Sequence, residues 1–458
     1  MRIDGDVVRP YRRAMQVEGV TPRVRAWPLV GGAVSYMRDP LAFFEGAAKL
    51  GPIVDLRLPP VKSFQFSDPA DIEYVLVTAH KGMSKDVALQ DLRHALGNGL
   101  LTSEGESWRR QRRIAQPAFH RDRIRTYAEQ MVSTAETVGA AFREGEARNL
   151  HADLMRTTLE IVTRCLFGSE LDDRDAKAIL VAMAAVTERF DGPLSLIPGM
   201  TRLPLPQFRR FKAAMLGFDR VITQLIARER ARGTDGGTNL LSMLLAAETE
   251  MGEPLDDVWV RDEVATMVLA GHDTTANVLA WTFALLGRHP RVDAKLHAEL
   301  AAVLGERSPS VDDLPNLPYV EQVVNEALRL YPPAWGFGRE VVEPFERRGI
   351  SFPKGTQIYM SPWVMHRNAD YFPEPLAFRP ERWADGFART LPKYAFLPFG
   401  GGPRVCIGNA FAMTEATLVL ATWARRFRFD LASNRPIVPR VSLTLGPRDG
   451  VLVRPRRR

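Results

Sequence analysis

The sequence predicts a mainly α-helical protein with small β-sheets, an α+β fold, organised as one large domain. Long segments carry apolar residues at helical spacing, whereas strand-like pieces are few and short. No internal repeat or low-complexity linker divides the sequence. Its 458 residues exceed the usual range for a single hydrophobic core, so two or three ordinary domains are the alternative to one large fold. We expect an N-terminal extension over residues 1–25 and a single domain over 26–458.

Strand-like pieces occur near the start, in the last third and near the end of the chain, which predicts a small sheet assembled from both ends. The candidate strands are residues 53–58, 63–67, 340–342, 357–360 and 441–445. A strand-rich lobe is therefore expected from about 50–70, 339–362 and 436–453, and a helical lobe from the remainder. The expected helices are part of 92–113, then 121–142, 150–167, 206–232, 256–288, 319–330 and 409–425.

Composition is that of a globular protein, with 45% hydrophobic and 25% charged residues. The net charge of +7 would suit an acidic partner, a membrane surface or nucleic acid. Part of the excess lies in arginines at both ends of the chain, at 9, 12 and 13 and at 454 and 456–458, which we interpret as solvated ends. We therefore expect no nucleic-acid partner, and we expect a monomer.

The two cysteines, Cys165 and Cys406, are too few for a disulfide framework or a cysteine-rich zinc site, which predicts a reduced, cytoplasmic setting. Residues 1–15 carry several charges and no apolar stretch of the length of a signal peptide or membrane anchor. The longest apolar run, residues 264–287, is interrupted by polar side chains at 272–275. We expect a buried core helix there and no integral membrane anchor.

The helix expected over 256–288 is the longest in the sequence. Its roughly 33 residues, at about 1.5 Å each, would reach about 50 Å and cross the molecule. Its polar break at 271–275 would then lie deep inside, where Thr274 can donate to the carbonyl oxygen of Ala270 and open the helix locally. From this segment alone, a groove beside a ligand and a simple kink at Gly271, with Asp273 paired to an arginine, are equally good interpretations.

Residues 399–408 read FGGGPRVCIG, an apolar entry and a glycine-rich bend followed by a single cysteine before a predicted helix. A cysteine at a helix start has its thiolate favoured by the helix dipole, as a metal-bound sulfur requires. Glycines before it let the backbone approach a flat ligand closely. A lone cysteine is more commonly a buried structural thiol, but the surrounding pattern favours metal binding by Cys406.

This loop resembles the haem-binding loop of the cytochrome P-450 family, of the soluble bacterial type, and the resemblance extends over residues 28–447. It implies that the long helix crosses over a haem b group whose iron is bound by Cys406. It also implies that Phe399, Gly400 and Gly408 contact the haem. The family's Glu-x-x-Arg helix is similar to Glu326–Arg329, and its later Pro-Glu-Arg segment is similar to residues 380–382.

In the family these charged groups meet in a buried cluster, which implies that Glu326, Arg329 and Arg382 fix the geometry of the haem loop. Spacing alone means little, because Glu229 and Arg232 share it. The residues that align with contacts to the haem propionates are Trp108, Arg112, Arg339 and Arg404. Lys85 is a weaker candidate for the same role. We expect His366 to form ordinary hydrogen bonds and not to bind iron.

Residues 270–275, AGHDTT, match the family's oxygen-activation motif and resolve the two interpretations of the long helix in favour of the ligand groove. The resemblance implies that Thr274 orders O2 and a water, and that Asp273 relays protons as a general acid and base. The implied activity is that of a monooxygenase, which inserts one oxygen atom of O2 into a substrate. A peroxide-using or peroxide-rearranging enzyme is the alternative, although such enzymes often lack the Asp273–Thr274 pair. A non-enzymatic gas sensor is a third hypothesis for the function, and such a sensor would need an output domain or a partner surface.

By resemblance, the substrate pocket is lined by mostly apolar side chains, which suggests a terpenoid, steroid, fatty acid or other hydrophobic secondary metabolite. The implied residues are Leu101, Met267, Ala270, Ala334, Trp335 and Phe337, with the variable stretch 190–211 and a hairpin near 443–445. Electrons would come from NAD(P)H through a separate ferredoxin or flavodoxin-type protein and its reductase. Arg109, Arg110 and Arg113 are candidates for docking that acidic partner.

Overall fold

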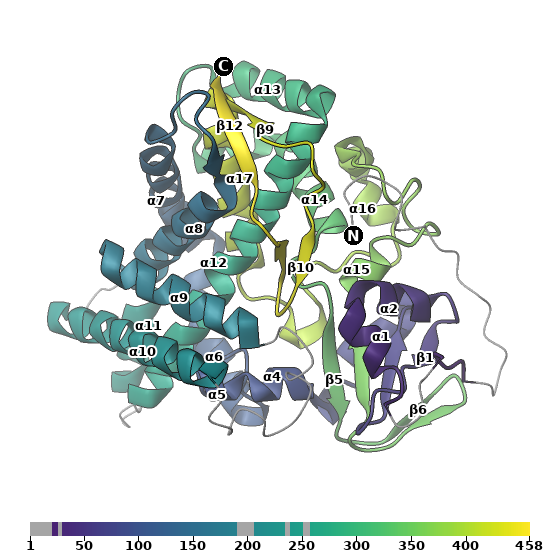
Figure 1. Ribbon diagram of the computed structural model, residues 1–458. Coiled ribbons are helices and arrows are strands. Elements are labelled where there is room, and N and C mark those ends of the chain that lie inside the picture. Colours follow the sequence, from purple (N-terminus) through teal and green to yellow (C-terminus); the bar gives the residue numbers. More distant parts are fainter. Residues whose placement is uncertain (1–20, 26–29, 190–205, 234–238, 251–256) are drawn as a thin grey trace. The chain divides into compact units, whose positions relative to one another are not determined.

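The computed structural model describes residues 21–25, 30–189, 206–233, 239–250 and 257–458 (Figure 1). Contacts divide the chain into two compact units. The first unit comprises residues 1–91 and 325–406, and the second comprises 92–324 and 407–458. Helices predominate and the sheets are small, which confirms the predicted α+β class. The single domain over 26–458 stays a prediction.

A five-stranded sheet is the centre of the first unit. Its strand order is β1 (Ile53–Asp55), β2 (Ser63–Phe66), β8 (Gln357–Met360), β5 (Phe337–Val341) and β3 (Met83–Lys85). The pair β2–β8 is parallel and its neighbours are antiparallel. A hairpin of β6 (Phe345–Arg347) and β7 (Ile350–Phe352) adds Phe352, whose ring lies 5.0 Å from that of Phe64. Strands far apart in the sequence thus share one apolar core.

The helices of the first unit are short. They are α1 (Ala33–Arg38), α2 (Pro40–Ala48), α3 (Pro69–Glu73), α4 (Val87–Asp91), α15 (Pro362–Met365) and α16 (Phe387–Thr390). A π-helical turn lies at Tyr74–Thr78, and tighter 3-10 turns lie at His80–Gly82, Pro380–Gly386 and Gly402–Arg404. The starts of the helices follow from local sequence, since Asp39 caps α2 by accepting from the Ala42 amide at 3.0 Å and a proline follows it.

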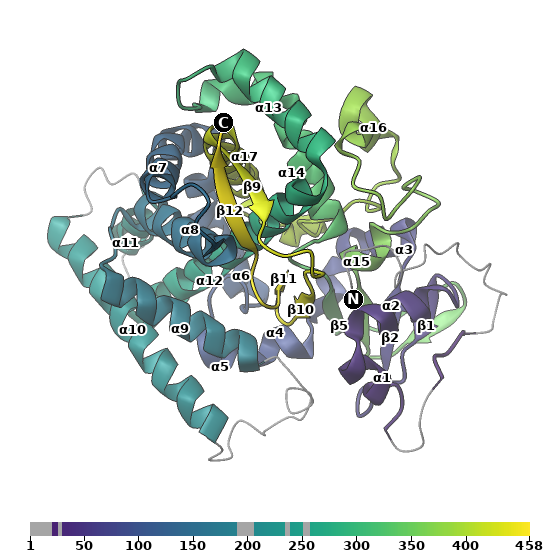
Figure 2. The same ribbon diagram turned by 45° about the horizontal axis from the view of Figure 1, so that its top comes forward.

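The second unit is helical. Its helices are α5 (Arg93–Leu96), α6 (Gly105–Ala115), α7 (Arg121–Ala140), α8 (Leu150–Phe167), α9 (Asp173–Arg189), α10 (Pro206–Arg232), α11 (Leu240–Glu250), α12 (Asp257–Arg288), α13 (Pro290–Leu304) and α17 (Asn409–Arg426), with turns at Gln116–Phe119 and Val311–Asn316. Helix α14 (Pro318–Leu330) belongs to both units. Figure 2 shows α8 beside α12, and an aromatic cluster in this unit contains Phe142, Phe283, Trp423 and Phe429.

Strands near the C-terminus form separate small sheets in the second unit and do not join the sheet of the first. One sheet has the order β4 (Arg148–Asn149), β12 (Leu452–Arg457) and β9 (Phe427–Leu431). The strand predicted over 441–445 is wrong in detail, because these residues form a tight hairpin. Its strands are β10 (Pro439–Val441) and β11 (Leu445–Pro447), and the Ser442 amide donates to the Thr444 carbonyl oxygen at 3.2 Å between them.

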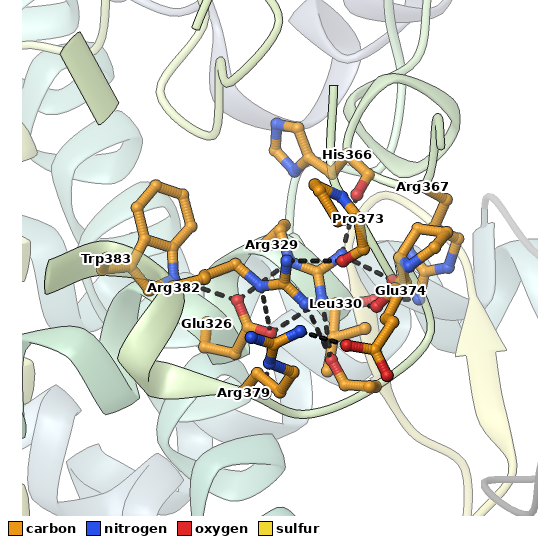
Figure 3. A network of polar contacts seen from close by, with 12 residues as sticks. Glu326, Arg329, Leu330, His366, Arg367, Pro373, Glu374, Arg379, Arg382 and Trp383 are labelled. Atoms are coloured by element: carbon orange, nitrogen blue, oxygen red, sulfur yellow. Dashed lines mark hydrogen bonds and ion pairs between the residues drawn. The ribbon is translucent and has the colours of Figure 1, made fainter. Parts of the chain in front are cut away.

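A buried charged cluster in the first unit is centred on Glu326 and Arg329 (Figure 3). Arg329 donates from Nε and Nη2 to the two carboxylate oxygens of Glu326, at 2.9 and 2.8 Å, and both side chains are fully buried. Arg382 Nε and Trp383 Nε1 donate to the same carboxylate, each at 2.9 Å. The carboxylate therefore has charged or polar partners on both oxygens, as a buried charge requires.

Arg329 also donates to three backbone carbonyl oxygens. Its Nη1 donates to the carbonyl oxygens of His366 and Pro375, at 2.9 and 2.6 Å, and its Nη2 to that of Ala377 at 3.0 Å. Arg382 in turn donates to the carbonyl oxygen of Pro373 at 2.8 Å. One buried guanidinium group thus ties α14 to the irregular chain that follows α15.

His366 is fully buried at the end of α15, where its Nε2 accepts from the Leu397 amide at 3.0 Å. It makes the ordinary hydrogen bond that the sequence analysis expected. Burial, and then the positive charges of Arg329 and Arg367, hold the pKa of this imidazole well below its usual value. The ring is therefore neutral in the folded protein, as an acceptor nitrogen requires.

Replacing Arg329 with lysine should destabilise the protein by about 3–5 kcal/mol, because three ammonium donors cannot satisfy the partners of a five-donor guanidinium group. Thermal unfolding measures the change. The matched control is Arg232→Lys on α10, since Arg232 also follows a glutamate by three residues but has a side chain that is 56% exposed. Its effect should stay within about 0.5 kcal/mol. Equal melting temperatures for the two variants would contradict the assigned role of Arg329.

His366 should make the protein sensitive to acid. Because its pKa is lower in the folded than in the unfolded state, its contribution is present above the unfolded value of about 6.5 and is lost as the pH falls below it. The loss should reach at most about 1.4 kcal/mol per pH unit. We expect His366→Asn to be less stable than the wild type at pH 7.5, with a gap in unfolding free energy that narrows toward pH 5. A gap independent of pH would show that His366 is not the titrating group.

Candidate active site

Cys406 lies in a tight loop of the first unit, and its side chain is exposed. Its amide donates to the carbonyl oxygen of Phe399 at 3.0 Å, which closes the loop, and the Val405 amide donates to Gly402 at 3.1 Å. Helix α17 begins three residues later, at Asn409, so Cys406 precedes the first helical turn and does not lie within it. The backbone hydrogen bonds of the loop therefore fix the position of the sulfur.

Two glycines permit this loop. Gly402 has a φ of +66°, and a Cβ there would lie 2.0 Å from the carbonyl oxygen of Leu76. A Cβ on Gly401 would lie 2.1 Å from the ring of Tyr394. Since neither position tolerates a side chain, the chain can pass close to its neighbours and leave Cys406 at the surface of the unit.

Helix α12 in the second unit carries the AGHDTT segment and is continuous through it, so the expected local opening does not occur. The Thr274 hydroxyl donates to the carbonyl oxygen of Ala270 at 2.8 Å, as the sequence predicted. Residues 264–269 and 275–286 are buried, yet Ala270 between them is exposed. On the other side of the helix, a Cβ on Gly271 would lie 2.8 Å from Val162 of α8. The exposed face at Ala270, with its small side chain, fits the flat face of a haem.

Asp273 is held by hydrogen-bond donors of the second unit. Its Oδ2 accepts from the Thr444 hydroxyl at 2.6 Å and from Asn277 Nδ2 at 3.1 Å. Within the part of the chain that the structure describes, these neutral side chains take the place of the arginine considered in the sequence analysis. Asn277 Oδ1 lies 2.9 Å from Nε2 of His151, which extends the network to α8.

His272, beside Asp273, is fully buried and its Nδ1 lies 2.7 Å from the carbonyl oxygen of Val268, to which it donates. Burial lowers the pKa of His272, so its imidazole is neutral. The ring therefore packs inside the second unit, whereas Asp273 and Thr274 are only partly buried.

The residues aligned with propionate contacts lie in both units. Trp108 and Arg112, on α6 of the second unit, line a cavity of about 870 Å³. Arg339, on β5 of the first unit, is nearly buried and donates from Nη1 to the Gly338 carbonyl oxygen at 2.7 Å. Arg404 lies in the turn just before Cys406. Lys85 pairs with Arg339 across β3 and β5 and is buried.

The expected substrate-pocket residues are likewise divided. Ala334, Trp335 and Phe337 belong to the first unit, and Leu101, Met267 and Ala270 to the second. Trp335 is only 9% exposed and packs against Phe44, with 5.9 Å between ring centroids, so its side chain serves the core of the first unit. Of the variable stretch 190–211, residues 190–205 lie outside the described residues.

Sequence reasoning missed Thr444, Asn277 and His151 as partners of the Asp273 site. Asn277 follows Asp273 by four residues on α12, and that spacing was the available signal. Thr444 is separated from Asp273 by 171 residues, and no local pattern connects them.

No helix in the described ranges is both long enough and apolar enough to span a bilayer. The chain matches the model of the family described as Cytochrome P450 over residues 22–455. It is similar to the cyclooctatin synthase of Streptomyces melanosporofaciens, with 38% identity over 428 residues that cover 92% of each chain. The cyclooctat-9-en-7-ol 5-monooxygenase of the same organism is 35% identical over 405 residues, covering 88% of this chain and 87% of that protein. The pentalenene oxygenase of Streptomyces avermitilis is 33% identical over 423 residues, 92% of this chain and 94% of that one.

The family match covers nearly the full length of the chain. It includes both the exposed cysteine of the glycine-rich loop and the Asp273–Thr274 pair on the long helix α12. The chain belongs to the cytochrome P-450 family and is a haem-dependent monooxygenase, which inserts one oxygen atom of O2 into a hydrophobic small molecule.

Proposed function

We propose that this monooxygenase oxidises a cyclic terpenoid, either a hydrocarbon or an alcohol derived from it. The main support is similarity over about nine-tenths of the chain to oxygenases whose names refer to cyclooctatin, cyclooctat-9-en-7-ol and pentalenene. On α12 the exposed Ala270 has a small apolar side chain, and Met267 lies one turn before it, which suits a substrate held by shape.

Cys406 is the proposed iron ligand, because it is an exposed thiol in a loop whose glycines admit close approach. Haem, when bound, supplies the binding of O2 and the transfer of one of its atoms. The residues proposed to hold the haem are Phe399, Gly400, Arg404, Gly408, Trp108, Arg112 and Arg339. The four side chains Trp108, Arg112, Arg339 and Arg404 carry N–H donors, three of them cationic, which suits carboxylate groups.

Thr274 and Asp273 are the proposed proton-handling residues. The Thr274 hydroxyl donates a hydrogen bond to the Ala270 carbonyl oxygen. Its oxygen can therefore still accept a hydrogen bond from water. Asp273 immediately precedes Thr274 on α12, and its Oδ2 is the oxygen that accepts from Thr444 and Asn277. The carboxylate can therefore take a proton from solvent on one oxygen while the other stays anchored.

Carbon monoxide added to the reduced protein should give the red-shifted Soret band of thiolate ligation, and Cys406→Ser should abolish it. The matched control is Cys165→Ser on α8, whose buried thiol lies 3.8 Å from the Tyr127 carbonyl oxygen and should leave the band unchanged. An unaltered band in Cys406→Ser would disprove the assigned ligand.

Spectral titration then tests the substrate class. Cyclic terpenoid hydrocarbons should produce the spin-state change of substrate binding, whereas linear fatty acids of equal carbon number should not. A spin-state change with the fatty acids and none with the terpenoids would overturn the terpenoid assignment. It would not contradict the monooxygenase activity.

We also propose a separate acidic ferredoxin or flavodoxin as electron donor, and a monomer in the cytoplasm. Arg109 and Arg113 lie four residues apart on α6, both exposed, and both line the 870 Å³ cavity with His120 and Arg123. Arg110 does not line that cavity and is only partly exposed, so we leave it out of the docking surface.

Charge reversal at Arg109 and Arg113 should raise the KM for an acidic ferredoxin by about tenfold at low salt, with less effect at high salt. The control is Arg143→Glu, an exposed arginine after α7. If both substitutions changed the KM equally, the effect would be one of net charge and not of docking on α6.

A further inference from the structure

The hairpin β10–β11 is tied to two helices of the second unit. Its Leu445 carbonyl oxygen accepts from Trp281 Nε1 of α12 at 3.1 Å, and both of these residues are fully buried. Its Ser442 hydroxyl donates to the carbonyl oxygen of Thr187 on α9 at 2.9 Å. Figure 1 shows the strand β10 near α12 within this unit. The turn that carries Thr444 is therefore held on both sides.

Thr444 contacts the carboxylate that the proposed function uses. Its hydroxyl donates to Asp273 Oδ2 at 2.6 Å, a short bond of the kind that forms to a charged acceptor. Asn277 Nδ2 donates to the same oxygen at 3.1 Å and lies 3.3 Å from the Thr444 hydroxyl oxygen. Two donors from different elements thus fix one oxygen of the carboxylate.

The orientation of the Asn277 amide is itself determined. Asn277 is buried, and its Oδ1 faces Nε2 of His151 at 2.9 Å, so this nitrogen must carry the proton and donate. Burial lowers the pKa of His151, which keeps the ring neutral with one donor nitrogen. Because Oδ1 accepts from His151, the amide nitrogen is left to face Asp273.

Gly446 lets the hairpin come this close. A Cβ at this position would lie 2.5 Å from Asn277 Oδ1, inside any real contact distance. The hairpin, α12 and α8 therefore meet around one carboxylate, and their fit depends on a missing side chain.

We propose that Thr444 is a positioning residue for oxygen activation: from the C-terminal hairpin it holds the Asp273 carboxylate in the orientation that delivers protons efficiently. This inference rests on the proposed role of Asp273. The hairpin carries no proton itself. It prevents rotation of the carboxylate, and without it electrons drawn from NAD(P)H would end in hydrogen peroxide instead of product.

The test compares Thr444→Val, which removes the hydroxyl at nearly constant volume, with Thr444→Ser, which keeps it. With the terpenoid that gives the strongest spin-state change, the valine variant should lower product per NAD(P)H consumed by about three- to tenfold, by loss of a hydrogen bond to a charged group. The serine variant should stay within about twofold of the wild type, and substrate affinity should not change in either. The control is Thr137→Val on α7, whose exposed hydroxyl donates to the Ser133 carbonyl oxygen.

A double-mutant comparison separates this inference from the role of Asp273. In an Asp273→Asn background, Thr444→Val should have no further effect on coupling. If Asp273→Asn alone left coupling intact, the proposed role of Asp273 would fail. If Asp273→Asn lowered coupling and Thr444→Val did not, the positioning role of Thr444 would be the part refuted.

Melting temperatures give a readout independent of turnover. Thr444→Val should lower the melting temperature of the haem protein by about 2–4 °C, and by less in an Asp273→Ala background, because alanine offers the Thr444 hydroxyl no acceptor. Equal decreases in both backgrounds would mean that Thr444 does not bond to Asp273 in solution, and would overturn the inference.

Discussion

The ion pair between Glu326 and Arg329 is the interaction that holds the irregular chain between His366 and Ala377 in place. Both side chains are fully buried, and the guanidinium group reaches the backbone at residues 366, 375 and 377. That stretch contains little regular structure, so its carbonyl oxygens depend on side-chain donors in place of a helix or sheet. Burying such a cluster costs desolvation energy, and its benefit is a defined geometry more than added stability.

Much of the fold could be predicted because helical periodicity is a local property. The bounds expected for α8 and α10 agree with the structure, and α12 differs by one residue at its start. Helix α13 was not predicted, although its first residue, Pro290, suits the first turn of a helix. Helix α9 was missed as well, between the two helices that were expected.

The candidate site was predictable to the extent that its residues lie in contiguous motifs. The loop before Cys406 and the segment from Ala270 to Thr275 are each readable from a few adjacent letters. Pairings across the fold were not readable, since the contact between Thr444 and Asp273 depends on how a hairpin packs on a helix. The contact of Trp335 with Phe44 was likewise not readable from a local motif, and its place at the pocket wall stays a prediction.

The anchors of the hairpin between β10 and β11 also determine which of its positions can vary. Ser442 and Thr444 are each committed to a neighbouring helix, and Gly446 cannot gain a side chain. Leu443 lies between the two anchored residues and is partly exposed. Natural variation or directed evolution of this turn therefore has most freedom at position 443, where a change of side-chain size can reshape the turn without disturbing its anchors.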